Sequence, residues 1–323
     1  MSSGSCVSPA SACKHAGMLD PLATNRVVLV DGGMGTELEA RGARMDNEAW
    51  SGLANLEAPG LVREIHEDYI RAGADVIIAN TFPANRLAMA AAGKADRVEE
   101  MNRAAVGAAR DARERAATGR PVAIAGSMSI WGPYEEAPGA GAPREALVLD
   151  VYREQAAILA AAGVDVIVLE MLDVRWAAAV TAARETGLPV WAGIWAHLDP
   201  DGRPITPKVG TPLADDLPAL LDGGDGLDAV LVMHSAVGAT LPALDVVARH
   251  WSGPRGAYPH AGRFERPNWI FEDIAPAALA DEAERWIDQG ARLVGGCCGT
   301  RPDHIAAIRE RVDGRSTTRA PLT

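Results

Sequence analysis

Eight short apolar runs alternate along the chain with longer segments typical of helices. The runs predict strands at Val27–Val30, Ala74–Ala79, Pro121–Ala125, Val164–Leu169, Pro189–Trp195, Leu227–Met233, Gly256–Tyr258 and Arg292–Val294, the seventh being the weakest. The segments between and after them predict helices at Pro59–Ala72, Ala95–Ala117, Pro143–Ala162, Val174–Thr186, Leu213–Leu221, Leu241–His250, Pro276–Gln289 and Pro302–Arg311. Several helices run into a glycine before the next strand, which is typical of a helix end.

Strands that alternate with helices predict parallel pairing and right-handed crossovers. Eight such units without a break in composition predict a single (β/α)8 TIM-type barrel over residues 26–313. A doubly wound open sheet is the structural alternative. Residues 1–25, rich in Ser, Ala and Gly, are expected to be a disordered N-terminal tail, and residues 314–323 a loose C-terminal tail.

A barrel of this type places its chemistry at the C-terminal ends of the strands. Polar and small residues gather at those ends, although they are rare inside the strands. In chain order they are Asp31–Glu37, Asn80-Thr81-Phe82, Gly126-Ser127, Glu170, Trp195 with His197, His234-Ser235, Tyr258-Pro259-His260 and Cys297-Cys298. We therefore expect these groups to face one shared cavity.

The stretch Leu293–Thr300 places two adjacent cysteines between glycines just after the last strand. Two neighbouring thiols at such a place are better suited to metal binding than to a disulfide, although they could also be small buried hydrophobes. Glu170 follows an apolar run, so its charge needs a cation or several donors. Asp31 could instead cap a turn. The loops that hold His197 and His260 predict solvated surface residues, and Trp131, Tyr134 and Trp195 could simply cover the barrel mouth.

The composition of the chain limits the classes of binding partner and the cellular location that are expected. Lys+Arg number 31 against 43 Asp+Glu, and the net charge of −12 argues against nucleic acid or an anionic membrane as a partner. No apolar stretch approaches the roughly 20 residues that span a bilayer, and the first 25 residues lack the apolar segment of a signal peptide. Four cysteines do not make a disulfide scaffold, so a cytoplasmic location is expected. Whether the protein forms a homo-oligomer is left open.

Three motifs together resemble the zinc-dependent homocysteine S-methyltransferase family. They are Asp31-Gly32-Gly33-Met34-Gly35-Thr36-Glu37-Leu38, Asn80-Thr81-Phe82 and Gly295-Gly296-Cys297-Cys298-Gly299-Thr300, with weaker matches at Gly126-Ser127, Leu169-Glu170 and Tyr258-Pro259. The resemblance spans roughly residues 26–311 and implies a single (β/α)8 barrel. It also implies that Cys297 and Cys298 are two of three zinc ligands, that Asp31 and Glu170 hold the ammonium of homocysteine, and that the Gly32-Gly33 turn receives its carboxylate.

The chain departs from the family at two strand ends. The family has an Asn-Cys pair after strand six, and the cysteine is its third zinc ligand, but this chain has Met233-His234. Histidine with two cysteines is a known catalytic zinc set, so His234, Cys297 and Cys298 are the expected ligands of Zn²⁺. After strand seven, Tyr258-Pro259-His260 replaces the family's usual Asn-Ser. Both changes face the expected substrate cavity.

The predicted activity is transfer of a methyl group from a small onium donor to the thiol of homocysteine or a close analogue, giving methionine. The donor would be a sulfonium such as S-methylmethionine, or betaine. Aromatic faces attract onium groups, and the expected donor pocket comprises Phe82, Ser127, Trp131, Tyr134, Trp195 and Tyr258. Two alternatives stay open: a zinc-assisted hydrolase or lyase on the same barrel, and a non-catalytic protein that senses redox state or holds a structural metal.

Overall fold

The computed structural model describes most of the 323-residue chain. The described ranges are 26–117, 119–129, 143–172, 176–207, 210–222, 226–265, 267–272 and 274–318. The predicted N-terminal tail and two residues of the predicted donor pocket, Trp131 and Tyr134, lie outside these ranges.

Eight parallel strands form the central sheet. They are β1 (Val28–Leu29), β2 (Val76–Ala79), β3 (Ala123–Ser129), β4 (Val166–Leu172), β5 (Val190–Ile194), β8 (Ala229–Ala236), β9 (Arg255–His260) and β12 (Leu293–Val294), in the order β1-β12-β9-β8-β5-β4-β3-β2. A parallel bridge between Val30 and Val76, with the Asp31 amide donating to the Val76 carbonyl at 3.0 Å, joins the two ends of the sheet. The predicted barrel is therefore confirmed, and the open sheet is excluded.

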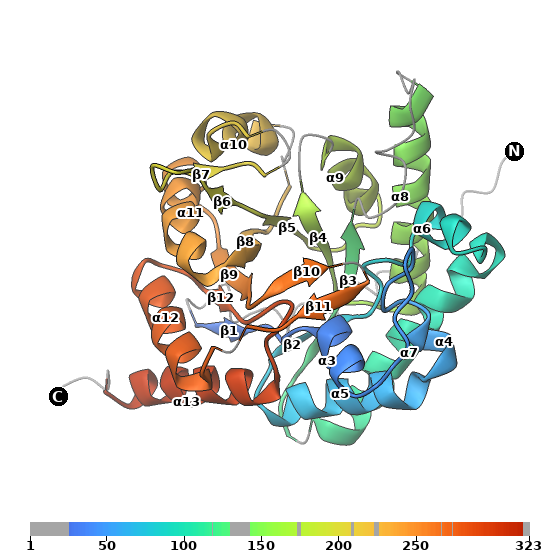
Figure 1. Cartoon of the computed structure of the whole chain (residues 1–323), viewed down its shortest axis with the longest axis horizontal. Helices are drawn as coiled ribbons and strands as arrows, with labels where there is room; N and C mark the ends of the chain where they lie inside the picture. Colours follow the sequence, from blue (N-terminus) through green and yellow to red (C-terminus); the bar gives the residue numbers. More distant parts are fainter. Residues whose placement is uncertain are drawn as a thin grey trace, which may run out of the picture.

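The predicted helices surround the sheet (Figure 1). They are α5 (Pro59–Arg71), α7 (Val98–Ala116), α8 (Pro143–Ala162), α9 (Trp176–Arg184), α10 (Leu213–Asp222), α11 (Val237–His250), α12 (Pro276–Asp288) and α13 (Pro302–Thr318). Pro59 and Pro276 stand at helix starts, where the missing N–H costs nothing. Gly73, Gly163 and Gly290 follow helix ends with positive φ. Helix α13 runs on to Thr318, past its predicted end at Arg311.

Several short elements in the loops were not predicted. They are α3 (Met34–Ala40), α4 (Ala54–Glu57), α6 (Arg86–Ala91) and two antiparallel hairpins, β6 (His197–Leu198) with β7 (Pro204–Ile205) and β10 (Arg263–Glu265) with β11 (Asn268–Ile270). These strands of two or three residues are too short to show an alternating pattern. The helix predicted to begin at Ala95 instead begins with a 3-10 turn, η1 (Ala95–Arg97), before α7. The hairpin β10–β11 lies over the centre of the barrel in Figure 1.

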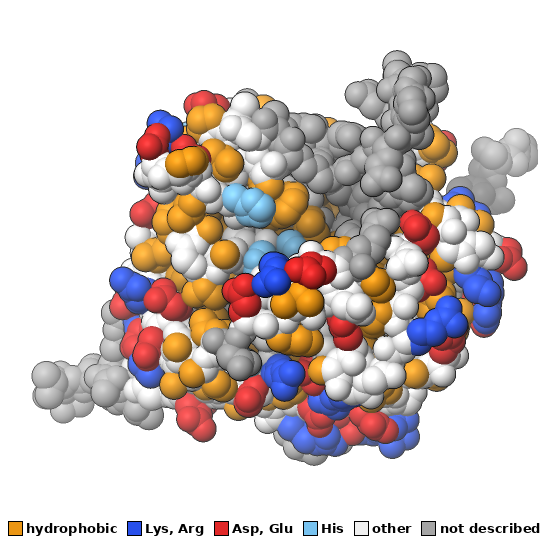
Figure 2. Space-filling model, viewed as in Figure 1, with side chains coloured by type: hydrophobic (Ala, Val, Ile, Leu, Met, Phe, Trp, Pro, Cys, Tyr) orange, Lys and Arg blue, Asp and Glu red, His pale blue; other side chains and the backbone are white. Residues whose placement is uncertain are grey.

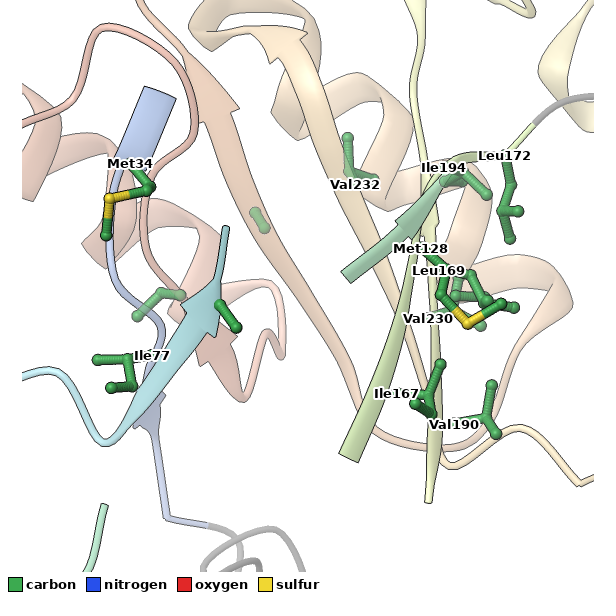
Figure 3. Close-up of a cluster of buried hydrophobic side chains, with 14 of the residues drawn as sticks. Met34, Ile77, Met128, Ile167, Leu169, Leu172, Val190, Ile194, Val230 and Val232 are labelled. Atoms are coloured by element: carbon green, nitrogen blue, oxygen red, sulfur yellow. The ribbon is translucent and has the colours of Figure 1, made fainter. Parts of the chain in front are cut away.

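Side chains of each barrel strand alternate between two cores. On β4, Val166 and Val168 pack inside the barrel, whereas Ile167 and Leu169 pack between the sheet and the helices. On β8, Leu231 and Met233 face inward, and Val230 and Val232 face the helices. Figure 3 shows Ile167, Leu169, Val230 and Val232 within this outer cluster. Successive side chains of a strand point to opposite faces of the sheet, and both faces are buried here. The strands are therefore apolar on both faces.

The helices within the described ranges were compared with the length and hydropathy that a bilayer requires. None of them is long and apolar enough to cross a membrane.

Candidate active site

A cavity of about 290 Å³ lies at the C-terminal ends of the barrel strands. Glycine-rich loops, aromatic rings and a few polar groups form its wall, as expected for a small-molecule site. The lining residues are Gly32, Gly33, Met34, Gly35, Trp50, Ile78, Ala79, Asn80, Phe82, Ser127, Glu170, Met171, Trp195, Met233, His234, Tyr258, Phe264, Trp269, Gly296, Cys297 and Cys298. Histidine side chains reach the surface near the centre of this face, among hydrophobic ones (Figure 2).

The loops after β1 and β12 are docked tightly against each other. The Gly33 amide donates to the Thr300 carbonyl at 3.0 Å, and the Gly296 amide donates to the Asp31 carbonyl at 3.0 Å. A Cβ atom on Gly33 would lie 2.7 Å from the Cys297 carbonyl oxygen, so only glycine permits this approach. The first and last motifs of the sequence therefore build one wall together.

His234, Cys297 and Cys298 form the one group of potential metal ligands among the described residues. Their ligand atoms all lie within 4.8 Å of one another. The Cys297 sulfur lies 3.6 Å from His234 Nδ1 and 3.9 Å from the Cys298 sulfur. A tetrahedral zinc ion with Zn–S bonds of about 2.3 Å and Zn–N bonds of about 2.0–2.1 Å needs separations of about 3.5 Å for S–N and about 3.8 Å for S–S. The two separations that involve the Cys297 sulfur are close to these values, and the His234–Cys298 separation is no more than 4.8 Å, so the three side chains are compatible with a zinc site.

An unusual backbone conformation brings His234 into the cavity. Strict alternation on β8 would turn it to the helix side with Val230 and Val232. His234 instead has φ of 43°, and the pairing of β8 with β9 shifts register between Met233 and Ala236. Within the described part of the chain, three non-glycine residues have positive φ, namely Trp50, Met171 and His234, and all three line the cavity. Such conformations cost free energy and gather at functional sites.

Burial sets the charge state of the metal-binding group. It lowers the pKa of His234 to about 3, with further lowering by His260 and His197, so the imidazole is neutral and ready to coordinate a metal. The neighbouring Cys298 thiol, together with burial, raises the pKa of Cys297 well above its usual value. In this form Cys297 keeps its proton, and a bound cation would reverse that.

The two predicted carboxylates, Asp31 and Glu170, interact electrostatically, but only Glu170 lines the cavity. Asp31 is 1% exposed; its Oδ2 accepts the Ile78 amide at 2.9 Å, while its Oδ1 is buried without a partner. Asp31 itself is not part of the cavity lining, whereas Gly32 and Gly33 are. Burial raises the pKa of Asp31 well above its usual value, and the nearby charge of Glu170 raises it further. Burial and the neighbouring Glu170 therefore both favour the protonated form of Asp31.

Glu170 faces the cavity directly from β4. The Ser127 hydroxyl donates a hydrogen bond to its carboxylate. Burial raises the pKa of Glu170 to about 7, and Ser127 and then Tyr258 offset part of this effect. The Tyr258 hydroxyl makes no bond of ordinary geometry. A half-ionised carboxyl group of this kind would become fully charged when a substrate ammonium arrives.

The aromatic wall differs in part from the predicted donor pocket. Phe82, Ser127, Trp195 and Tyr258 line the cavity as expected. Trp50, Phe264 and Trp269 also line it but were not predicted. Trp50 stands edge-on to Phe82 and Phe264 at centroid distances of 6.4 and 6.2 Å. Phe264 and Trp269 belong to the β10–β11 hairpin, whose three-residue strands are too short to show a periodic pattern. Their aromatic side chains were the only feature in the sequence that could have identified them.

The two histidines that were predicted to be solvated differ. His197 is exposed, as predicted. His260 is only partly exposed, so that prediction was wrong; its ring centroid lies 4.7 Å from that of His234 and 5.5 Å from that of Trp269. The loop composition suggested solvent, but the hairpin that follows β9 folds back and covers this side chain.

Comparisons with known proteins agree with this architecture. A sequence model of the homocysteine S-methyltransferase family matches residues 28–312. Homocysteine S-methyltransferase 4 of Zea mays and homocysteine S-methyltransferase of Escherichia coli (strain K12) are each 32% identical to this chain. The alignments cover 88% of this chain in both cases, and 89% and 95% of those proteins, respectively. The selenocysteine methyltransferase of Astragalus bisulcatus is 27% identical over 90% of this chain and 96% of its own.

The barrel also superimposes on a solved relative. The metallated form of the homocysteine methyltransferase MmuM from Escherichia coli has a TM-score of 0.73 and 29% identity, covering 91% of this chain and 99% of that one. The oxidised form gives a TM-score of 0.75. With the barrel, the docked first and last motifs and these relatives in agreement, the chain belongs to the homocysteine S-methyltransferase family and is an S-methyltransferase.

Proposed function

We propose that this protein moves a methyl group from a small onium donor to the thiol of homocysteine or a close analogue, with zinc held by His234, Cys297 and Cys298. The observation that carries the proposal is the clustering of these ligand atoms within 4.8 Å, with both separations from the Cys297 sulfur close to those of tetrahedral zinc. Three protein ligands leave one of four positions for a substrate atom. When bound there, zinc would lower the pKa of the acceptor thiol and so make it a nucleophile at neutral pH.

The chain's own residues would orient the acceptor. Glu170 faces the cavity and would hold the ammonium group, whose positive charge would also favour the ionised form of the buried Asp31. Homocysteine and selenocysteine, the amino acids in the names of the similar proteins, both carry such an ammonium group on the carbon chain that bears the nucleophilic sulfur or selenium. An amino acid thiol or selenol is therefore the acceptor class that this charge pattern favours.

The aromatic wall would receive the donor. Trp50, Phe82 and Phe264 surround one side of the cavity with ring faces and edges, and cations bind well to such faces. A sulfonium or quaternary ammonium carries its methyl group beside the positive charge. In the reaction, the bond from that methyl to the donor breaks as a new S–CH₃ bond forms, and the acceptor thiol loses its proton. With S-methylmethionine and homocysteine, both products are methionine.

A donor screen tests the proposal. The zinc-loaded protein is incubated with homocysteine, cysteine or selenocysteine and with S-methylmethionine, S-adenosylmethionine or betaine, and methylated products are measured by mass spectrometry. We expect methionine from homocysteine with at least one sulfonium donor. Cleavage of a donor by water without an acceptor would instead support the hydrolase. Zinc binding with no turnover of any pair would support a non-catalytic role.

A further inference from the structure

The two departures from the family's sequence, His234 and His260, are in direct contact. The first lies on β8 and the second on the neighbouring β9, and their ring centroids are 4.7 Å apart with an interplanar angle of 62°. Trp269 of the β10–β11 hairpin contacts both, at 5.8 and 5.5 Å. An edge-to-face arrangement of this kind is one of the favoured geometries for aromatic pairs, and it stabilises the folded state beyond the effect of burial alone.

His234 needs such support because its strand does not orient it. Its positive φ and the register shift remove it from the alternating pattern of β8. A metal-binding histidine is ordinarily oriented by a hydrogen bond from its second ring nitrogen to a carboxylate or carbonyl. Within the described ranges, the imidazole of His234 has a polar contact only to the Cys297 sulfur. The imidazole of His234 is therefore held by contacts with neighbouring rings and not by the usual hydrogen bond.

His260 is placed to act through His234 and not on the substrate. It does not belong to the cavity lining or to the group of ligand atoms within 4.8 Å of one another. Its Nδ1 is buried without a hydrogen-bond partner, and its ring packs against the His234 ring with the ring centroids 4.7 Å apart. It thus contacts the ring of the residue whose backbone conformation is unusual.

We infer that His260 is a positioning residue that holds the His234 imidazole in its metal-facing orientation. The inference rests on the proposed role of His234 as a zinc ligand. It makes the two sequence departures one coupled change, because a histidine ligand has a ring to orient and the family's cysteine has none.

A double-mutant cycle on zinc affinity tests the coupling. Affinity is measured by competition with a chromogenic chelator for the native protein, His260→Ala, His234→Cys and the double variant. Loss of an outer partner of a metal ligand typically weakens binding 10–100-fold. We expect a weakening in that range for His260→Ala alone, and less than about 3-fold when His260→Ala is added to His234→Cys. An equal loss in both backgrounds would show a general structural role, and no loss in either would show that β8 alone orients His234.

If His234→Cys does not bind metal, two further variants test whether His260 positions the His234 imidazole. His260→Phe restores a ring edge and should keep most of the zinc affinity that His260→Ala loses. His197→Ala removes an exposed histidine that contacts Trp195 at 5.5 Å, and should change nothing. The absorption bands of the Co²⁺-substituted protein should shift in His260→Ala and return in His260→Phe. Matching results for the Ala and Phe variants would overturn the inference. Failure of the native protein to bind zinc would instead overturn the proposed function.

Discussion

The sulfur of Cys297 lies 3.6 Å from Nδ1 of His234, although 63 residues separate them in the chain. The strands that lead to them, β12 and β8, are not neighbours, because β9 lies between them. The loop after β12 is held against the end of β9, where the Cys297 amide donates to the Pro259 carbonyl at 2.7 Å. The contact between Cys297 and His234 brings together the ligand atoms of the proposed metal site from two segments that are far apart in sequence.

His234→Ala should remove most of the zinc. The variant leaves two cysteines and so lacks one of three protein ligands of the proposed site. We expect metal content after dialysis against a mild chelator to fall to a small fraction of one equivalent, measured by mass spectrometry of the metal. His197→Ala, which alters an exposed histidine nearby, should retain full zinc. Full occupancy in His234→Ala would mean that the histidine is not a ligand.

Glu170→Gln should weaken use of the acceptor. The substitution keeps the shape of the side chain but removes the charge that faces the ammonium, a charge-assisted bond worth about 1.5–3 kcal/mol. We expect kcat/KM for homocysteine to fall by a factor on the order of 10 to 100. Glu185→Gln, at an exposed glutamate paired with Arg153, is the matched control and should have no effect.

The pH profile separates charge from shape at the same residue. Since the pKa of Glu170 is about 7 in the empty site, native kcat/KM for the acceptor should fall as pH drops below about 7, where the carboxylate becomes protonated. Glu170→Gln should lack this acidic limb. An unchanged kcat/KM and an unchanged profile would point to an acceptor without an amino group.

Gly35→Ala should disturb the aromatic wall. A Cβ atom at Gly35 would lie 2.5 Å from the ring of Trp50, which must then move away from Phe82 and Phe264. We expect a change in near-ultraviolet circular dichroism and a rise of the donor KM by roughly 10-fold, because one lost cation–ring contact is worth about 0.5–2 kcal/mol. Gly60→Ala is the control, since a Cβ there would contact nothing within 4 Å. A shifted spectrum with an unchanged donor KM would place the donor elsewhere.

His66 should make the protein sensitive to acid. It is fully buried on α5, neither ring nitrogen has a partner, and burial lowers its pKa to about 3. Between that value and the ordinary pKa of about 6.5, the unfolded chain binds one more proton than the folded one. Its contribution to stability is therefore complete above pH 6.5 and is lost at about 1.4 kcal/mol per unit as pH falls.

Replacing this histidine tests the slope. His66→Leu should flatten the decline in the free energy of unfolding between about pH 6.5 and pH 4, measured by urea denaturation at several pH values. His250→Gln, at an exposed residue at the end of α11, should keep the native slope. An identical slope in His66→Leu would show that other groups dominate acid unfolding.

The order of strands and helices was readable from the sequence because both are local patterns. A buried parallel strand such as Val166–Leu172 is apolar on both faces, and the polar Glu170 near its end stands out for that reason. The same pattern located Cys297 and Cys298 at the end of β12. The hairpin β10–β11 was missed, because strands of three residues have no measurable period.

What the sequence determined by itself is the barrel and the residues at its strand ends, since apolar periodicity and glycine placement fix elements one at a time. Only the tertiary structure decided how the side chains of those residues are oriented and buried. Strand alternation would have sent His234 toward the helices, but positive φ and a register shift turn it toward Cys297. Composition predicted His260 to be solvated, but the hairpin covers it. Both outcomes depend on contacts between segments distant in sequence, and no local pattern encodes them.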